Sequence, residues 1–319
     1  MQYFKRQQKQ QTREQDVQEK SAVNSSKRIL IIGGGISGLS AALWCQRQGL
    51  QPLIIEQTPR LGGQLHQIHL PLVDYPGFKG TASELLETLV AQISEQDIHY
   101  RLGQSIKHID YKNNVAYTEN ESLTYSALIM ATGNRKRALP QLKPFMGRHV
   151  HMTATGVIEQ LKHQHIAIIG GGDGAFENAL LLAPSVNKVD ILIRSGQPRA
   201  RQYFVEQARR ISNISLHYQQ KVQYFKDEPT FRGLHLAHSI TGEEQRLECD
   251  QVIIKCGYTP AQELLPESLL PPENGLQLDD QNIWVIGDVR NPIDPCMSVC
   301  IGEAARASRE ISRYLEPIG

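Results

Sequence analysis

Arg28-Ile29-Leu30-Ile31-Ile32-Gly33-Gly34-Gly35-Ile36-Ser37-Gly38 decides the fold of this chain. A short run of mostly β-branched residues that ends in glycines is typical of a buried parallel strand leading into a tight turn. The apolar spacing over residues 38–48 predicts a helix that closes at Gly49, and residues 52–56 supply the next strand. The stretch therefore predicts a βαβ unit.

The glycines of this stretch have the spacing Gly33-x-Gly35-x-x-Gly38. This spacing lets the chain turn tightly, brings the backbone close to a diphosphate and packs the helix against the strand. The start of the helix offers free N–H groups and the positive end of its dipole to phosphates. Glu56, eighteen residues beyond Gly38, is placed to accept hydrogen bonds from a ribose. The pattern predicts a dinucleotide site.

A second glycine fingerprint follows downstream. Residues 165–169 lead into Gly170-x-Gly172-x-x-Ala175, a helix is expected from about residue 175, and residues 189–193 form the next strand. That strand ends at Arg194 with no carboxylate, and Arg199 and Arg201 follow soon after. A cation there suits the 2′-phosphate of NADP, whereas a carboxylate would suit the free hydroxyl of NAD. The alternative is that these arginines belong to a solvated basic loop.

Three further strands indicate how the domains are connected. Residues 127–133 and 251–257 are apolar runs that end in small residues, as expected where the chain leaves a domain. Residues 283–286 run into Gly287-Asp288 and a helix over residues 296–315, so the first domain is expected to be discontinuous. We expect a polar, disordered extension at 1–27, two parts of one domain at 28–142 and 262–319, and an inserted domain at 148–258.

Composition limits the functional classes. The 319 residues are 40% hydrophobic and 21% charged with a net charge of +1, which fits a two-domain enzyme and gives no reason to expect a nucleic-acid partner. Five scattered cysteines do not resemble a secreted disulfide framework, so a cytoplasmic location is expected. No stretch approaches the ~18 consecutive apolar residues of a membrane span. No metal site is expected, because neither cysteines nor carboxylates complete a ligand set with the paired histidines His66, His69, His149 and His151.

Several separated motifs make residues 28–319 resemble a low-molecular-weight thioredoxin reductase. They occur in the order Leu61-Gly62-Gly63-Gln64-Leu65, Asp74-Tyr75-Pro76-Gly77-Phe78, Ala131-Thr132-Gly133, the fingerprint at 170–175 and Gly287-Asp288. The resemblance implies an α/β fold of two Rossmann-like, three-layer ββα domains. In that fold an NAD(P)-binding domain is inserted into an FAD-binding domain and rotates relative to it. We also expect a homodimer.

The resemblance further implies which residues hold the cofactors. FAD would be held at seven positions, Gly33, Gly35, Gly38, Glu56, Gly63, Gln64 and Asp288. NADP(H) would be held at five, Gly170, Gly172, Ala175, Arg194 and Arg199, where the two arginines match the phosphate-binding motif of the family. Ser195 stands where that motif usually has another arginine, so NADP and NAD both stay open.

One motif departs from the family. Where thioredoxin reductases carry Cys-Ala-Thr-Cys-Asp, this chain reads Thr153-Ala154-Thr155-Gly156-Val157. Thiol–disulfide exchange needs two thiols and a thiolate nucleophile, and a threonine hydroxyl replaces neither. Ordinary thioredoxin reductase activity through this site is therefore excluded on chemical grounds.

Cys296 and Cys300 are the remaining candidates for a redox pair. The alignment of Gly287-Asp288 places both beside the flavin ring, and residues i and i+4 of a helix can lie at the ~6 Å Cα separation that a disulfide permits. Pro295 suits a helix start, where the dipole would lower a thiol pKa. The alternative is that both cysteines are small packing groups.

These observations predict a FAD-dependent oxidoreductase in which NAD(P)H and FAD exchange a hydride. The onward partner is expected to be a small redox protein of the ferredoxin or flavodoxin type, because members of that kind resemble this family and lack the active-site cysteines. Two alternatives stay open. One is a disulfide oxidoreductase that uses Cys296 and Cys300 on a low-molecular-weight disulfide or through a second flavin. The other is a non-catalytic flavin-binding sensor.

Overall fold

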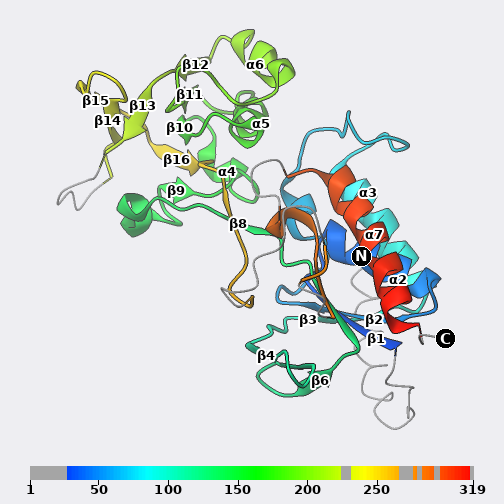
Figure 1. Cartoon of the computed structure of the whole chain (residues 1–319). Coiled ribbons are helices and arrows are strands. Elements are labelled where there is room, and N and C mark those ends of the chain that lie inside the picture. Colours follow the sequence, from blue (N-terminus) through cyan, green and yellow to red (C-terminus); the bar gives the residue numbers. More distant parts are fainter. Residues whose placement is uncertain (1–26, 224–230, 266–275, 279–281, 291–294, 317–319) are drawn as a thin grey trace.

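The computed structural model describes residues 27–223, 231–265, 276–278, 282–290 and 295–316. They form two units, each built on a five-stranded sheet, with a two-stranded ribbon between them (Figure 1). Of the polar extension expected at 1–27, all but Lys27 lies outside the described residues. The predicted α/β class with two Rossmann-like units is confirmed.

The first unit has an all-parallel sheet in the order β18-β7-β1-β2-β3. Its strands are β1 (Arg28–Ile32), β2 (Gln51–Glu56), β3 (His99–Leu102), β7 (Ala127–Met130) and β18 (Ile283–Val285). One face is covered by α2 (Ile36–Arg47), α3 (Ala82–Glu95) and α7 (Met297–Leu315). The other face is covered by the antiparallel sheet of β4 (His108–Asp110), β5 (Val115–Tyr117) and β6 (Ser122–Thr124).

Alternation along β1 explains these three layers. Ile29 and Ile31 pack with the helices, whereas Leu30 and Ile32 pack with the small antiparallel sheet. A parallel strand that is buried on both faces needs an apolar side chain at nearly every position. The aliphatic run of β1 therefore packs against the layers on both faces of the sheet.

The second unit repeats the design with the all-parallel order β12-β11-β10-β16-β9. Its strands are β9 (Val150–His151), β10 (His165–Ile169), β11 (Lys188–Leu192), β12 (Ile214–His217) and β16 (Gln251–Ile254). One face is covered by α4 (Ile158–Leu161), α5 (Asp173–Leu182) and α6 (Gln202–Arg209). The other is covered by the antiparallel sheet of β13 (Gln220–Val222), β14 (Leu234–His238) and β15 (Glu244–Leu247).

A ribbon of two antiparallel strands connects the units. β8 (Asn134–Lys136) follows β7, and β17 (Tyr258–Pro260) follows β16, with Tyr258 opposite Lys136 (Figure 1). The two apolar strands that the sequence predicted as exits thus lead into one ribbon. The short helix η4 (Pro140–Phe145) comes next, and its Leu142 packs in the core of the second unit. The domain limits 28–142, 148–258 and 262–319 stay predictions.

A buried carboxylate lies inside the second unit. Asp190 on β11 is fully buried and accepts hydrogen bonds from His217 (2.7 Å) and His165, on the two neighbouring strands, and from Lys188 (3.0 Å). Burial raises the pKa of Asp190, but the three donors outweigh burial and hold that pKa below its usual range. The carboxylate is therefore stabilised as a charged group that links three strands.

Replacing this carboxylate should destabilise the fold. Asp190→Asn keeps the shape but removes the charge that three donors share, and we expect a loss of about 3 kcal/mol in the free energy of unfolding. In the wild type this stabilisation is present at neutral pH, and it should fade as the pH falls below about 4, because the folded-state pKa lies below the unfolded one. Urea unfolding at several pH values measures both effects.

The matched control is Asp97→Asn, the same chemical change at an exposed position whose positive φ of 51° asparagine tolerates. An Asp190→Asn protein as stable as the Asp97→Asn protein would show that the buried carboxylate contributes nothing.

Candidate dinucleotide sites and the junction between the units

The first glycine turn has the geometry of a phosphate cradle. Gly33 has φ +110°, and a Cβ on it would stand 2.3 Å from the carbonyl oxygen of Ala131, the residue after β7. A Cβ on Gly38 would stand 1.9 Å from the Gly33 oxygen, so the helix packs directly on the turn. A Cβ on Gly35 would meet nothing within 4 Å, and Gly35 has ordinary extended backbone. The open space in front of Gly35, at the start of α2, fits the diphosphate of FAD.

Glu56 lies beside this turn at the end of β2. It is buried, and its carboxylate accepts hydrogen bonds from the backbone N–H groups of Gly34 (2.7 Å) and Thr58 (2.8 Å). These two bonds fix the side chain at the carboxyl edge of the sheet, and a carboxylate oxygen can accept further bonds. The structure thus places Glu56 where the sequence argument put a ribose-binding acid.

Three polar side chains from distant segments meet at the edge of the first unit. Gln64, in the short helix η3 (Gly63–Gln67), donates from Nε2 to Asn134 Oδ1 (2.8 Å) and to Asp288 Oδ2 (2.9 Å). A Cβ on Gly63 would stand 3.1 Å from Gly35 Cα, so this segment lies against the first turn. Asn134 Nδ2 is buried and has no hydrogen-bond partner among the residues that the structure describes. An orphaned donor beside the phosphate cradle fits a cofactor that brings acceptors, as a flavin does.

The predicted cysteine pair lies at the start of α7 with both thiols free. Cys296 is exposed and is the N-cap residue, and Cys300 is buried. Cys300 Sγ donates to Asp288 Oδ1 at 3.4 Å. Burial and the neighbouring Asp288 carboxylate raise the pKa of Cys300 to about 12. Little thiolate exists at Cys300 at neutral pH, so the structure gives this thiol the character of a packing group, and the redox pair stays a prediction.

The second glycine turn copies the first. Gly170 has φ +150°, and a Cβ on it would stand 2.2 Å from the Lys255 carbonyl oxygen of the neighbouring strand segment. Gly172 has extended backbone and open space around its missing Cβ, and Ala175 is buried at the packing position. The helix α5 begins at Asp173, two residues earlier than expected. This turn fits the diphosphate of a nicotinamide dinucleotide.

The basic loop after β11 is anchored on this turn. The backbone N–H of Arg199 donates to the Gly171 oxygen at 2.7 Å, and the side chains of Arg194 and Arg199 are exposed. Neither guanidinium pairs with another side chain in the part of the chain that the structure describes. Arg201 differs, because it pairs with Asp173 (2.7 Å) and with Asp74 of the first unit.

Threonines replace the missing thiols at the junction between the units. Thr153 Oγ1 and Thr155 Oγ1 lie 3.0 Å apart between β9 and α4, and Thr155 Oγ1 is hydrogen bonded to His69 Nε2 of the first unit. Burial and the nearby cations Lys255 and Lys136 lower the pKa of His69. The junction therefore holds a neutral imidazole and two hydroxyls, which bind across the units and have no redox chemistry of their own.

Sequence reasoning missed a group of charged residues at the same junction. Lys136 on β8, Lys255 after β16 and Glu177 on α5 are half-buried, and burial lowers the pKa of both lysines and raises that of Glu177. None of the three side chains forms a hydrogen bond or an ion pair with a described residue. Lys255 could have been noticed in the sequence as a lysine at the end of an otherwise apolar strand. Asn134, the missed residue of the first site, could have been noticed because it directly follows the motif Ala131-Thr132-Gly133.

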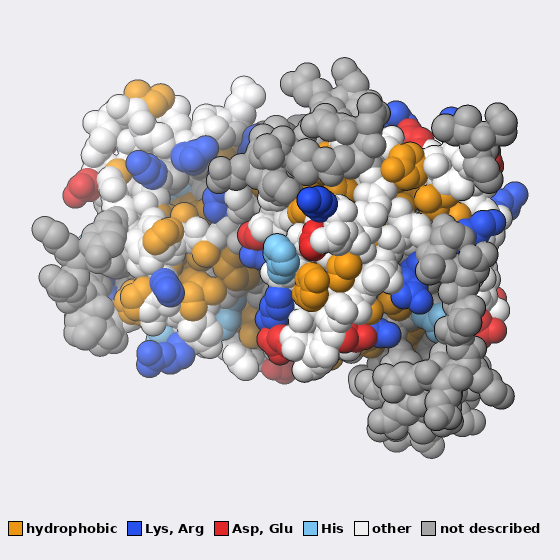
Figure 2. Space-filling model, turned by 60° about the horizontal axis from the view of Figure 1, so that its bottom comes forward, with side chains coloured by type: hydrophobic (Ala, Val, Ile, Leu, Met, Phe, Trp, Pro, Cys, Tyr) orange, Lys and Arg blue, Asp and Glu red, His pale blue; other side chains and the backbone are white. Residues whose placement is uncertain are grey.

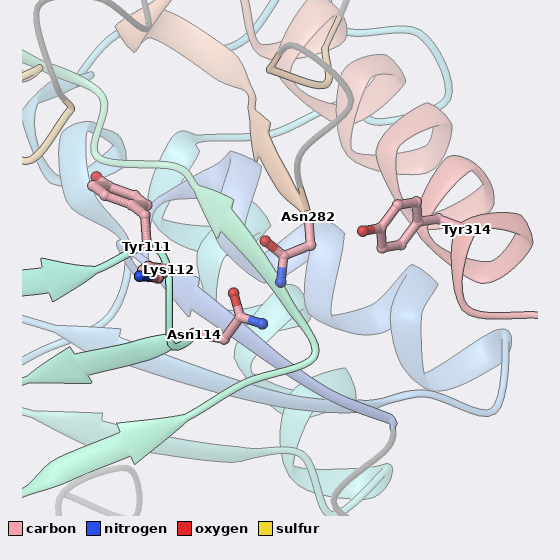
Figure 3. A pocket seen from close by; sticks show the side chains of 5 residues that line it. All are labelled: Tyr111, Lys112, Asn114, Asn282 and Tyr314. Atoms are coloured by element: carbon pink, nitrogen blue, oxygen red, sulfur yellow. The ribbon is translucent and has the colours of Figure 1, made fainter.

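One further cavity lies away from the two glycine turns. A cavity of about 430 Å³ is lined by Tyr111, Lys112, Asn114, Asn282 and Tyr314 (Figure 3). Asn282 precedes β18, so this cavity lies at the amino end of the strand, opposite the edge with the glycine turns. Figure 2 shows positive and negative side chains interspersed over one face. Among the described residues, no helix is long and apolar enough to span a bilayer, and no cluster suits a metal ion.

Comparisons with known proteins agree with this geometry. Residues 27–310 match the pyridine nucleotide-disulphide oxidoreductase family. The thioredoxin reductase of Treponema pallidum is 27% identical over 91% of this chain and 97% of its own length. The ferredoxin–NADP reductase of Limosilactobacillus fermentum is 29% identical over 91% of this chain and 94% of its own length.

Solved structures show the same fold. The thioredoxin reductase of Lactococcus lactis in its FR conformation superposes with a TM-score of 0.83 at 23% identity, over 91% of this chain and 99% of that one. Thioredoxin reductases and ferredoxin–NADP reductases use FAD and NADP(H), in agreement with the two cradles. The predicted family resemblance is confirmed: the chain belongs to the pyridine nucleotide-disulphide oxidoreductase family and is a flavin-dependent oxidoreductase.

Proposed function

We propose that this chain moves electrons between NADPH and a small carrier protein of the ferredoxin or flavodoxin type through FAD. The observation that carries the proposal is the pairing of two intact dinucleotide cradles with Thr153 and Thr155 at the place of the family's thiols. The sequence similarity to a ferredoxin–NADP reductase over nearly the whole chain supports it. A thioredoxin substrate would need thiols that this junction lacks.

The first unit would hold FAD, which supplies the acceptor for a hydride and the donor of single electrons. The turn of Gly33, Gly35 and Gly38 would receive the diphosphate through backbone N–H groups, and Glu56 would accept the ribose hydroxyls. Gly63 brings Gln64 against the turn, and Gln64 and Asp288 would hold the part of FAD between the diphosphate and the ring. Asn134 Nδ2 would donate a hydrogen bond to the same cofactor.

The second unit would hold NADPH. Gly170 and Gly172 would receive its diphosphate at the start of α5, and Ala175 keeps the helix close to the turn. Arg194 and Arg199, which are exposed and pair with no described side chain, would bind the 2′-phosphate. Arg201 is less suited to this task, because Asp173 and Asp74 already neutralise it.

Electron transfer through Cys296 and Cys300 is the weaker candidate. The pair lies beside Asp288 and so beside the proposed flavin site. A raised thiol pKa at Cys300 opposes the thiolate that exchange requires. The homodimer and the cytoplasmic location expected from the sequence remain predictions alongside this proposal.

Reductive titration distinguishes the two routes. If no thiol pair takes part, anaerobic titration with NADPH should consume two electrons per bound FAD, and Cys296→Ser and Cys300→Ser should leave this number unchanged. Uptake of four electrons, reduced to two by Cys296→Ser, would establish the disulfide route instead. A flavin that neither NADPH nor NADH reduces would rule out the proposed function and favour a sensor.

Alanine substitutions can assign each cradle to its cofactor. Gly35 and Gly172 both have backbone angles that alanine adopts without strain, so Gly35→Ala and Gly172→Ala should fold and only fill the space in front of a turn. We expect Gly35→Ala to be purified without the yellow colour of FAD. Gly172→Ala should keep FAD and lose NADP⁺ binding. The ratio of absorbance at 450 nm to that at 280 nm measures FAD content, and calorimetry measures NADP⁺ binding. Loss of FAD from Gly172→Ala and loss of NADP⁺ binding from Gly35→Ala would instead assign FAD to the second unit and NADP(H) to the first.

The choice between NADPH and NADH can be traced to one arginine. Arg199→Ala removes a cation from the proposed 2′-phosphate site, so the KM for NADPH should rise about tenfold while the KM for NADH stays unchanged. Steady-state reduction of an artificial dye measures both. Arg209→Ala, an exposed arginine at the end of α6, serves as the control. An equal effect on both nucleotides would place Arg199 outside the 2′-phosphate site.

A further inference from the structure

Lys255 occupies a special position in the second unit. It follows β16, which lies on the opposite side of β10 from β11 and β12. The strand order therefore reverses between β10 and β16, and in open α/β sheets ligands bind in the crevice at such a switch point. Gly170 stands on one side of this crevice and Lys255 on the other, joined by the hydrogen bond from Lys255 N to Ile169 O (2.7 Å).

The side chain of Lys255 crosses the glycine turn. Its Cβ would lie 3.0 Å from a Cβ on Gly170, and its Cδ would lie 3.7 Å from a Cβ on Gly174. Gly174 is the second residue of the ten-residue helix α5. The aliphatic part of the lysine thus runs from the strand end over the turn to the first turn of the helix, where a diphosphate would lie.

The ammonium at the end of this side chain is neither hydrogen bonded nor ion paired within the described part of the chain. Lys255 Nζ forms no hydrogen bond or ion pair with another described residue, although the side chain is half-buried. Lys136 on β8 repels this ammonium and Glu177 on α5 attracts it. Its charge also contributes to lowering the pKa of His69 in the first unit. A half-buried cation that no carboxylate contacts directly is costly, and the cost falls when an anion binds beside it.

The position of Lys255 indicates which half of the dinucleotide would lie beside it. Arg194 and Arg199 lie after β11, so the adenosine half with its 2′-phosphate extends to that side of β10. The other half must then extend over β16. On the basis of the proposed function, we infer that Lys255 binds the phosphate on the nicotinamide side of NADP(H), and so distinguishes the intact dinucleotide from its adenosine fragment.

The test compares two ligands that differ in this half. NADP⁺ carries the nicotinamide-side phosphate, and adenosine 2′,5′-bisphosphate lacks it. Calorimetric titration of the oxidised, FAD-loaded protein with Lys255→Gln should show about tenfold weaker NADP⁺ binding and unchanged bisphosphate binding. Lys255→Arg keeps the charge and should recover much of the loss. Lys221→Gln, an exposed lysine on β13 of the same unit, is the matched control.

Two outcomes would overturn the inference and separate it from the proposed function. If the wild type binds both ligands and Lys255→Gln binds them equally well, or weakens both by the same factor, Lys255 does not bind the nicotinamide-side phosphate. The proposed function survives either result. If the FAD-loaded wild type binds neither ligand, the proposed NADP site and this inference are both wrong.

The pH dependence of binding gives an independent readout. Burial and repulsion by Lys136 lower the pKa of Lys255 to about 8. The charged form binds phosphate, so wild-type affinity for NADP⁺ should be full below pH 8 and should fall as the pH rises through that value. Affinity for the bisphosphate should stay level between pH 7 and about 9, since arginine keeps its charge there. An unchanged NADP⁺ affinity across this range would contradict the assigned role.

Discussion

The close approach of a glycine to the end of a neighbouring strand determines the arrangement of both sites. In the first unit Gly33 packs on the carbonyl of Ala131, directly after β7, and in the second Gly170 packs on the carbonyl of Lys255, directly after β16. A side chain on either glycine would force the strands apart. Since β7 and β16 continue into β8 and β17, the same contact fixes each phosphate cradle relative to the ribbon between the units.

This coupling explains why the polar residues of the junction come from the ribbon and its approaches. Asn134 begins β8, directly after the strand that Gly33 contacts, and it reaches Gln64 beside the first turn. Lys255 and Tyr258 follow the strand that Gly170 contacts. Burial, Glu177 and Asp288 raise the pKa of Tyr258, which therefore stays protonated in the junction. Each cradle thus brings its own set of polar groups toward the other unit.

The fold could be predicted from the sequence because its determinants are local. The run 28–32, the glycine spacings and the strands at 127–130 and 251–254 carry their structure in consecutive residues. The helix starts were expected too late, at 38 and 175 instead of 36 and 173, because the extended N-cap glycines Gly35 and Gly172 end the turn earlier than apolar spacing indicates. Gln64 and Asp288 were expected at the FAD site from the family resemblance, but their contact with each other and with Asn134 could not be predicted. Gln64 lies 70 residues from Asn134 and 224 from Asp288, and the three meet only in the folded protein. Asp190, inside an apolar strand, gave no sign of its histidine partners.

The contacts between the two units can be understood from the thiols that this chain lacks. In a thioredoxin reductase the second unit carries the thiols, so that unit must turn to bring either thiols or nicotinamide to the flavin. Here Thr155 binds His69 and Arg201 binds Asp74, and both bonds hold the second unit against the first. An exposed ion pair alone contributes little, on the order of 1 kcal/mol or less, so these contacts bias the arrangement without locking it. Under the proposed function electrons pass between the flavin and the carrier without thiols of the second unit. A bias toward one arrangement then obstructs no electron transfer between the flavin and the carrier.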